Sequence, residues 1–244
     1  MTNYTTGLDA LNALSEVNDD STSNKAEFTK LNAGDRIVVK ALSLSDVTMV
    51  YAYGNYGKGV NTFVAKEPSI KTNKGWPKEK LTPWDKAFLY HKEKSKVYND
   101  EHGTAASSYK GKPRFAMGFY SLDSKSFIVV DLTKTQAMSV AESLKKYEAK
   151  FGKKAFELEK SAGTSGIVSL SPLDLDDLTP EQQKAFDEAP AEFDKSLLDG
   201  IYYELDEKEQ VDALRRVGFD VSLIGYGASE TPANDTPAEE DFPF

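Results

Sequence analysis

Short runs of β-branched and aromatic residues, each bounded by Gly, Asp or Asn, recur along this chain and indicate antiparallel strands. The expected strands cover residues 36–44, 47–53, 60–66, 114–121, 126–132, 155–160 and 166–172. Between the later strands, residues 135–150 carry apolar side chains at helical spacing and predict a helix. This pattern favours a small Greek-key barrel. The fold class we expect is therefore mainly β: a β-barrel, in the form of an elaborated OB-fold, with added α-helices and a disordered acidic C-terminal tail.

Four parts are expected along the chain. Residues 1–25 read as a short N-terminal helix with a polar linker, and residues 26–173 as the OB-fold domain. The domain includes a basic stretch, 67–113, with little periodicity, which reads as a long functional loop. Residues 174–227 read as an acidic helical region, in which Thr179, Pro180 and Gln182 form a helix start with a capping box. A second helix is expected there at 207–217.

The tail, residues 228–244, contains five acidic residues and no Lys or Arg. Such a segment cannot bury enough apolar surface to fold, so we expect it to be solvated and disordered. It nevertheless ends in two phenylalanines. Acidic residues beside an apolar anchor suit capture by a basic, apolar pocket of another protein. The alternative is a terminus without a function.

Composition excludes several classes. The chain contains no apolar run of about 18 residues, so no membrane span is expected. The first residues lack the charged and long apolar regions of a secretory signal. Cysteine is absent, which excludes disulfides and thiolate metal sites and agrees with a reducing compartment. We expect a cytoplasmic protein without membrane partners.

Charge is unevenly distributed along the chain. Residues 36–160 hold 23 Lys and Arg against 13 Asp and Glu, whereas residues 161–244 hold 5 against 20. The formal net charge is −9. A basic body followed by an acidic end suggests a polyanion-binding body with an acidic interaction tail. A solvated surface of mixed sign is the alternative.

Patterns typical of enzymes are weak. The glycine-rich stretch 54–59 lacks the spacing of a phosphate-binding loop and reads as a hairpin turn. His91 and His102 lie in a polar stretch without the spacing of a metal site. Three aspartates precede the helix that begins at Thr179, and their negative charge complements the helix dipole. They are Asp174, Asp176 and Asp177. We therefore expect no enzymatic activity, no cofactor and no metal.

A nucleic-acid-binding pattern is stronger. Single strands bind to basic grooves lined with aromatic side chains, because every base offers a π-face and every nucleotide a phosphate. Residues 66–114 hold 12 Lys and Arg against 6 Asp and Glu, interleaved with aromatics. About half or fewer of the aromatics are expected to contact DNA, since others belong to a core. The candidate DNA-binding residues are Tyr51, Tyr53, Tyr56, Lys58, Lys66, Lys71, Lys74, Trp76, Lys78, Trp84, Tyr109, Lys110, Lys112 and Arg114.

The C-terminal residues Asp241-Phe242-Pro243-Phe244 resemble the tail tip of bacterial single-stranded DNA-binding proteins. Residues 28–44 and 125–173 resemble the corresponding parts of bacteriophage helix-destabilising proteins. The resemblance implies an OB-fold that binds single-stranded DNA in replication and recombination, in the bacterial host cytoplasm if the chain is phage-encoded. It also implies a tail that recruits partner proteins, with Glu239, Glu240 and Asp241 meeting a basic rim and Phe242, Pro243 and Phe244 at the anchoring tip.

The function we expect is sequence-nonspecific binding that coats and protects single-stranded DNA. One alternative is an acidic interaction or inhibitor protein that mimics DNA to occupy a host DNA-processing enzyme. Another is a magnesium-dependent nuclease that uses Asp174, Asp176 and Asp177. RNA as a ligand and the oligomeric state stay open at this point. The lack of cysteine argues against the zinc site that some phage relatives carry.

Overall fold

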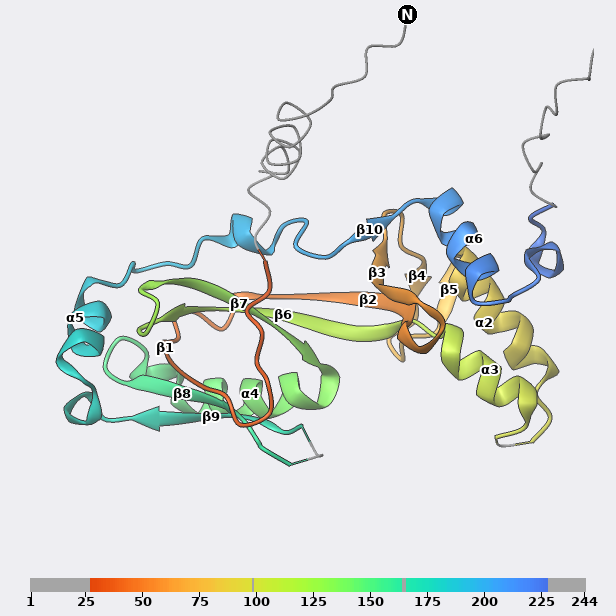
Figure 1. The fold of residues 1–244 in the computed structure, drawn as a ribbon. Coiled ribbons are helices and arrows are strands. Elements are labelled where there is room, and N and C mark those ends of the chain that lie inside the picture. The colour runs from red at the N-terminus through yellow and green to blue at the C-terminus, as the bar shows by residue number, and fades with distance from the viewer. Residues whose placement is uncertain (1–26, 98, 164–165, 228–244) are drawn as a thin grey trace, which may run out of the picture. The chain divides into compact units, whose positions relative to one another are not determined.

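The computed structural model describes residues 27–97, 99–163 and 166–227 (Figure 1). In this part of the chain the fold is mixed α/β, with an eight-stranded mixed sheet, a separate two-stranded hairpin and five α-helices. None of these helices is both long and apolar enough to cross a membrane. The expected N-terminal helix within 1–25 and the expected disordered tail 228–244 lie outside the described residues.

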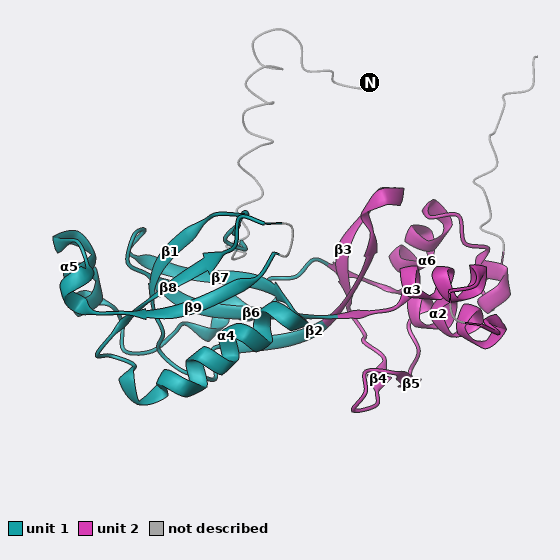
Figure 2. Ribbon diagram, turned by 90° about the horizontal axis from the view of Figure 1, so that it is seen from below, with its two compact units in different colours: residues 1–50, 113–203 teal, residues 51–112, 204–244 magenta. Residues whose placement is uncertain are grey.

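Two compact units divide the chain (Figure 2). Unit 1 consists of residues 1–50 and 113–203, and unit 2 consists of residues 51–112 and 204–244. The chain passes from unit 1 to unit 2 within strand β2 (Val47–Asn55). These divisions differ from the boundary expected after residue 173. They also make the basic stretch 67–113 part of a folded unit instead of a loop.

Unit 1 contains five antiparallel strands in the order β7-β6-β1-β8-β9. Its pairing register includes Gly118 opposite Val129 and Val39 opposite Phe156. Among the described strands β9 pairs only with β8, so this sheet is open and the expected closed barrel is not found. The sequence predicted these five strands to within a few residues. They are β1 (Arg36–Lys40), β6 (Lys112–Ser121), β7 (Ser126–Thr133), β8 (Ala155–Lys160) and β9 (Val168–Leu173).

Helix α4 (Lys134–Tyr147) packs on β7 and β9 of unit 1. Thr133 and Gln136 form a reciprocal capping box at its start. Its buried side chains join a core cluster that contains Phe119, and Phe115 packs against this cluster as a partly buried residue. The sequence therefore predicted this helix to within a few residues.

Helix α5 (Pro180–Glu188) begins after Thr179, with Gln182 completing its capping box, as the sequence predicted. Its buried face packs in a second core cluster with Tyr120 and Leu122. Short 3₁₀ turns at Glu148–Lys150, Leu175–Asp177 and Lys195–Leu198 complete unit 1. Burial of these apolar faces stabilises the unit by about 25 cal/mol per Å².

Unit 2 begins with a hairpin of β2 and β3 (Val60–Ala65), joined by a 3₁₀ turn at Tyr56–Lys58. Gly59 ends this turn at φ +74°, which confirms the predicted hairpin turn. Strand β10 (Glu204–Leu205) then pairs in parallel with β3. A two-stranded hairpin follows β3 along the chain, formed by β4 (Ile70–Lys71) and β5 (Pro77–Glu79).

Three helices surround the aromatic core of unit 2. Helix α2 (Pro83–Lys94) packs against α3 (Glu101–Tyr109) and α6 (Glu207–Arg216), and the 3₁₀ turn Val221–Ile224 also packs on α2. The prediction that 67–113 is a loop was wrong here, because Thr82 caps α2 and Asp100 caps α3. The predicted helix at 207–217 is confirmed as α6.

Candidate nucleic-acid-binding surface

Three of the aromatics that the sequence proposed for DNA binding form the core of unit 2. Tyr53, Trp84 and Tyr109 are 4%, 0% and 7% exposed. The Trp84 ring lies edge-on to Phe63 at a centroid distance of 5.3 Å and to Tyr109 at 5.8 Å. The Trp84 indole nitrogen donates to the Gln210 carbonyl at 3.2 Å. Burial removes these rings from contact with any nucleic acid, so their assignment as binding residues is corrected.

The assignment of Lys71 as a DNA-binding residue is also corrected, because its ammonium belongs to a buried polar cluster. Lys71 Nζ lies 2.7 Å from Asp85 Oδ2, and the side chains are 5% and 1% exposed. Tyr53 donates its hydroxyl to the same carboxylate oxygen at 2.7 Å. Burial, followed by the negative charge of Asp85, raises the pKa of Tyr53 well above its usual range. Tyr53 therefore stays a neutral hydrogen-bond donor.

Tyr56 and Trp76 are the exposed candidate aromatics, at 87% and 37%. Tyr56 lies in the 3₁₀ turn between β2 and β3, and Trp76 lies in the turn between β4 and β5. Tyr51 is half-buried, with the Lys71 ammonium 4.9 Å from its ring centroid. Because the side chains of Tyr56 and Trp76 are exposed, these are the candidate rings that a base can reach.

Four of the predicted lysines are exposed and form no ion pair with any described residue. They are Lys66, Lys74, Lys110 and Lys112. Lys110 Nζ lies over the Trp76 ring, 5.4 Å from its centroid. Lys78 is exposed but pairs with Glu79 at 2.8 Å, and Lys58 donates to the Val217 carbonyl at 2.9 Å. Unit 2 thus presents cations that are free to neutralise phosphates.

Arg114 lies in unit 1, apart from this set. Its guanidinium forms an ion pair with Asp131 across the β6–β7 pair. Tyr202 also donates to Asp131 Oδ1 at 3.1 Å, and burial together with this carboxylate raises the pKa of Tyr202. Arg114 therefore belongs to a local network in unit 1, and it follows Lys112 by two residues on strand β6.

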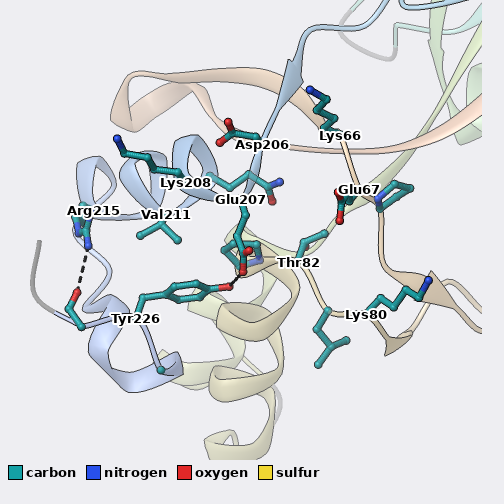
Figure 3. A pocket seen from close by; sticks show the side chains of 16 residues that line it. Lys66, Glu67, Lys80, Thr82, Asp206, Glu207, Lys208, Val211, Arg215 and Tyr226 are labelled. Atoms are coloured by element: carbon teal, nitrogen blue, oxygen red, sulfur yellow. Dashed lines mark hydrogen bonds between the residues drawn. The ribbon is translucent and has the colours of Figure 1, made fainter.

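A hollow of about 1290 Å³ opens in unit 2 beside the start of α6 (Figure 3). Lys66, Lys80 and Lys208 line it, and Tyr226 points its hydroxyl to Glu207 within it. Arg215 reaches the Gly227 carbonyl at 3.3 Å. Lys208 and Tyr226 were not in the predicted site, because they lie far along the chain from residues 51–114.

The remaining candidates for chemistry are the acidic residues at 174–177 and the two histidines. Among the described residues no three or more His, Asp and Glu side chains gather as a metal site. Asp174 forms an ion pair with Lys154, which lowers the pKa of Asp174. His91 and His102 approach each other with their Nδ1 atoms 2.9 Å apart. The described part of the chain therefore offers nothing specific to the nuclease alternative.

Comparison of the chain with models of known families, with curated proteins and with solved structures finds no match.

Proposed function

We propose that this chain is a non-enzymatic protein that binds single-stranded DNA without sequence preference and protects it during replication and recombination. The observation that carries the proposal is the exposed Trp76 of unit 2 with the Lys110 ammonium 5.4 Å from its ring centroid. Lys74 and Lys112 of the same unit are also exposed and form no ion pair with a described residue. An aromatic platform next to unpaired cations is the combination that single-strand binders use.

The assignment of unit 1 to the OB-fold is part of this proposal. An OB-fold is a five-stranded, partly open Greek-key barrel, and unit 1 has five antiparallel strands. The chain order of strand β7, helix α4 and the β8–β9 hairpin also agrees with the resemblance to phage helix-destabilising proteins. Strand β9, the last strand of unit 1, contains Pro172-Leu173, as that resemblance requires.

The acidic tail completes the proposed function. Glu239, Glu240 and Asp241 would contact a basic rim on replication or recombination proteins, and the Phe242-Pro243-Phe244 tip would fill an apolar pocket. Such recruitment takes place in the cytoplasm, that of the bacterial host if the chain is phage-encoded. In the absence of DNA the same negative charge would compete with phosphates for the basic surface.

The first test is a titration with fluorescent oligo-dT and with duplex of equal length at two salt concentrations. Tight, salt-sensitive binding to the single strand, with much weaker binding to duplex, is the expected result. A single-stranded RNA of equal length measures the preference between the two nucleic acids. Failure to bind any of these nucleic acids at low salt would favour the alternative, an acidic interaction or inhibitor protein. That alternative is supported by the charge of residues 161–244, which hold 5 Lys and Arg against 20 Asp and Glu.

Charge reversal locates the surface. The triple variant K74E/K110E/K112E should lose most of its affinity for oligo-dT, because three phosphate contacts disappear. The matched control is K145E/K150E/K153E, which changes the net charge equally at exposed lysines of unit 1. Equal losses in both variants would contradict a binding surface on unit 2.

A further inference from the structure

We infer that Trp76 and Lys110 form a subsite for one unpaired nucleotide, in which the indole stacks on the base and the ammonium meets the adjacent phosphate. This inference rests on the proposed function and names the residues that would carry it.

The Trp76 ring is supported from the protein interior. Phe88 of α2 is 3% exposed and packs against Trp76 at a centroid distance of 5.4 Å and an interplanar angle of 45°. Trp76 itself stays 37% exposed. A ring that is held by the core and still reaches solvent can accept a base without first leaving a buried position.

Lys110 supplies the charge next to this ring. Its ammonium lies 5.4 Å from the centroid of Trp76, and Lys110 forms no ion pair with a described residue. The long, flexible lysine side chain can turn from the ring to a phosphate when a base takes its place over the indole. One ring and one adjacent cation match the base and the phosphate of a single nucleotide.

Backbone hydrogen bonds fix the turn that carries Trp76. Thr72 N donates to the Trp76 carbonyl at 2.8 Å, and Trp76 N donates to Thr72 Oγ1 at 3.1 Å. Gly75 has φ +77°, and a Cβ at this position would lie 2.9 Å from the Tyr51 hydroxyl. Glycine therefore allows the turn to close against Tyr51, which limits the motion of Trp76.

The buried ion pair of Lys71 with Asp85 anchors this hairpin to α2. Lys71 directly precedes Thr72, and Asp85 lies one turn of α2 ahead of Phe88. The same helix therefore holds both the hairpin with Trp76 and the side chain beneath its ring. Lys71 and Asp85 are therefore positioning residues for the subsite. Because they hold the hairpin in place before a base binds, less conformational entropy is lost on binding.

Stacking on Trp76 requires a base with a free face. In a duplex both faces of each base are covered by neighbouring base pairs, whereas an unpaired base can turn one face to the indole. The subsite therefore selects single strands over duplex through access to the base, without reading its identity.

Tryptophan fluorescence tests the subsite directly, because the chain has two tryptophans and Trp84 is fully buried. Before oligo-dT is added, iodide should quench mainly Trp76. Saturation with oligo-dT should change this emission and protect it from iodide. The variant W76F should keep most of its affinity, whereas W76A should lose about 5- to 150-fold, the range that stacking gives. Ile70→Ala, at an exposed position of the same hairpin, is the matched control.

Three outcomes distinguish failure of the nucleotide subsite from failure of the proposed function. Unchanged affinity in W76A, together with unaltered iodide quenching in oligo-bound wild type, overturns the subsite and leaves the proposed function in place. Binding of no oligonucleotide by the wild type overturns both. In K110A the subsite also predicts a salt slope that is smaller by about 0.7, the value for one phosphate contact of a single strand. A slope equal to that of the wild type excludes Lys110 from the subsite.

Discussion

The ammonium of Lys71 and the carboxylate of Asp85 meet at 2.7 Å with both side chains almost completely buried. Removal of water from two charges is costly, and only good geometry and further hydrogen bonds offset that cost. Here Tyr53 donates a further hydrogen bond to Asp85 Oδ2, while Asp85 Oδ1 has no hydrogen-bond partner among the described residues. The cost of burying the two charges is therefore only just offset by their interactions, and loss of either Lys71 or Asp85 should destabilise the protein.

Lys71→Met should destabilise the protein by about 3–5 kcal/mol, because it leaves the Asp85 carboxylate buried and unpaired. Urea denaturation followed by circular dichroism measures the change. Lys78→Met is the matched control: its partner Glu79 is exposed, so the cost should be below about 1 kcal/mol. The double variant K71M/D85N should recover part of the stability. Equal effects at Lys71 and Lys78 would contradict the buried pair.

Gly118→Ala should destabilise unit 1 by about 1–3 kcal/mol through overpacking. A Cβ on Gly118 would lie 2.4 Å from the Phe193 ring, and Gly118 is paired along β6. Thermal unfolding measures the effect. Gly57→Ala, where the nearest atom lies at 3.8 Å, should be close to neutral. If the loss is due to the ring of Phe193, G118A should cost much less in an F193A background.

Unfolding should become easier in mildly acidic solution because of His91. Burial, with smaller contributions from His102 and Lys94, lowers the pKa of His91, while Glu101 opposes the shift. The unfolded chain then binds the proton more readily, so stability present above the ordinary pKa of 6.5 is lost as the pH falls through the lower folded value.

The measurement is the melting temperature at pH 7.5 and at pH 5. The wild type should lose stability between these values, and His91→Gln should lose less, because glutamine does not titrate. Of the rings that pack on His91, Tyr109 and Phe219 carry no charge in this range, whereas His102 is a second imidazole at a centroid distance of 5.2 Å. An identical pH dependence in the variant would show that other groups are responsible.

The same substitution should cost very different amounts of stability at the two tryptophans. Trp84→Ala should cost about 3–5 kcal/mol, because loss of a fully buried indole leaves a cavity and removes its hydrogen bond to the Gln210 carbonyl. Trp76→Ala should cost far less in stability, since its ring is partly exposed. Guanidinium denaturation of both variants checks this. A large stability loss for W76A would mean that Trp76 serves the core.

Local sequence patterns were sufficient for several elements. The capping box of Thr179 and Gln182 and the strand at residues 155–160 appear where they were predicted. Helix α2 has the same start signal, Thr82 followed by Pro83, yet the lysine-rich composition after it led to the prediction of a loop. Capping residues were the more reliable guide, because they satisfy specific backbone groups whatever the surrounding composition.

The candidate site was predicted only in part, for a physical reason. Alternation along β2 puts Tyr51 and Tyr53 on one face, but it could not say that Trp84 and Asp85 of α2 pack on Tyr53. Likewise Lys71 and Asp85 are 14 residues apart, and only the fold brings them together. Exposure of Trp76 and burial of Trp84 depend on which surface each helix covers, and this is decided by contacts far apart in sequence.

The composition of unit 2 from residues 51–112 and 204–227 determines when it can form during synthesis. Its core needs Leu205, Leu214 and Phe219, which leave the ribosome about 100 residues after Tyr109. Until then Trp84 and its neighbours have no cover from α6. Chains that end before residue 204 therefore lack the cover of the aromatic core, so unit 2 can fold only after synthesis has passed Phe219.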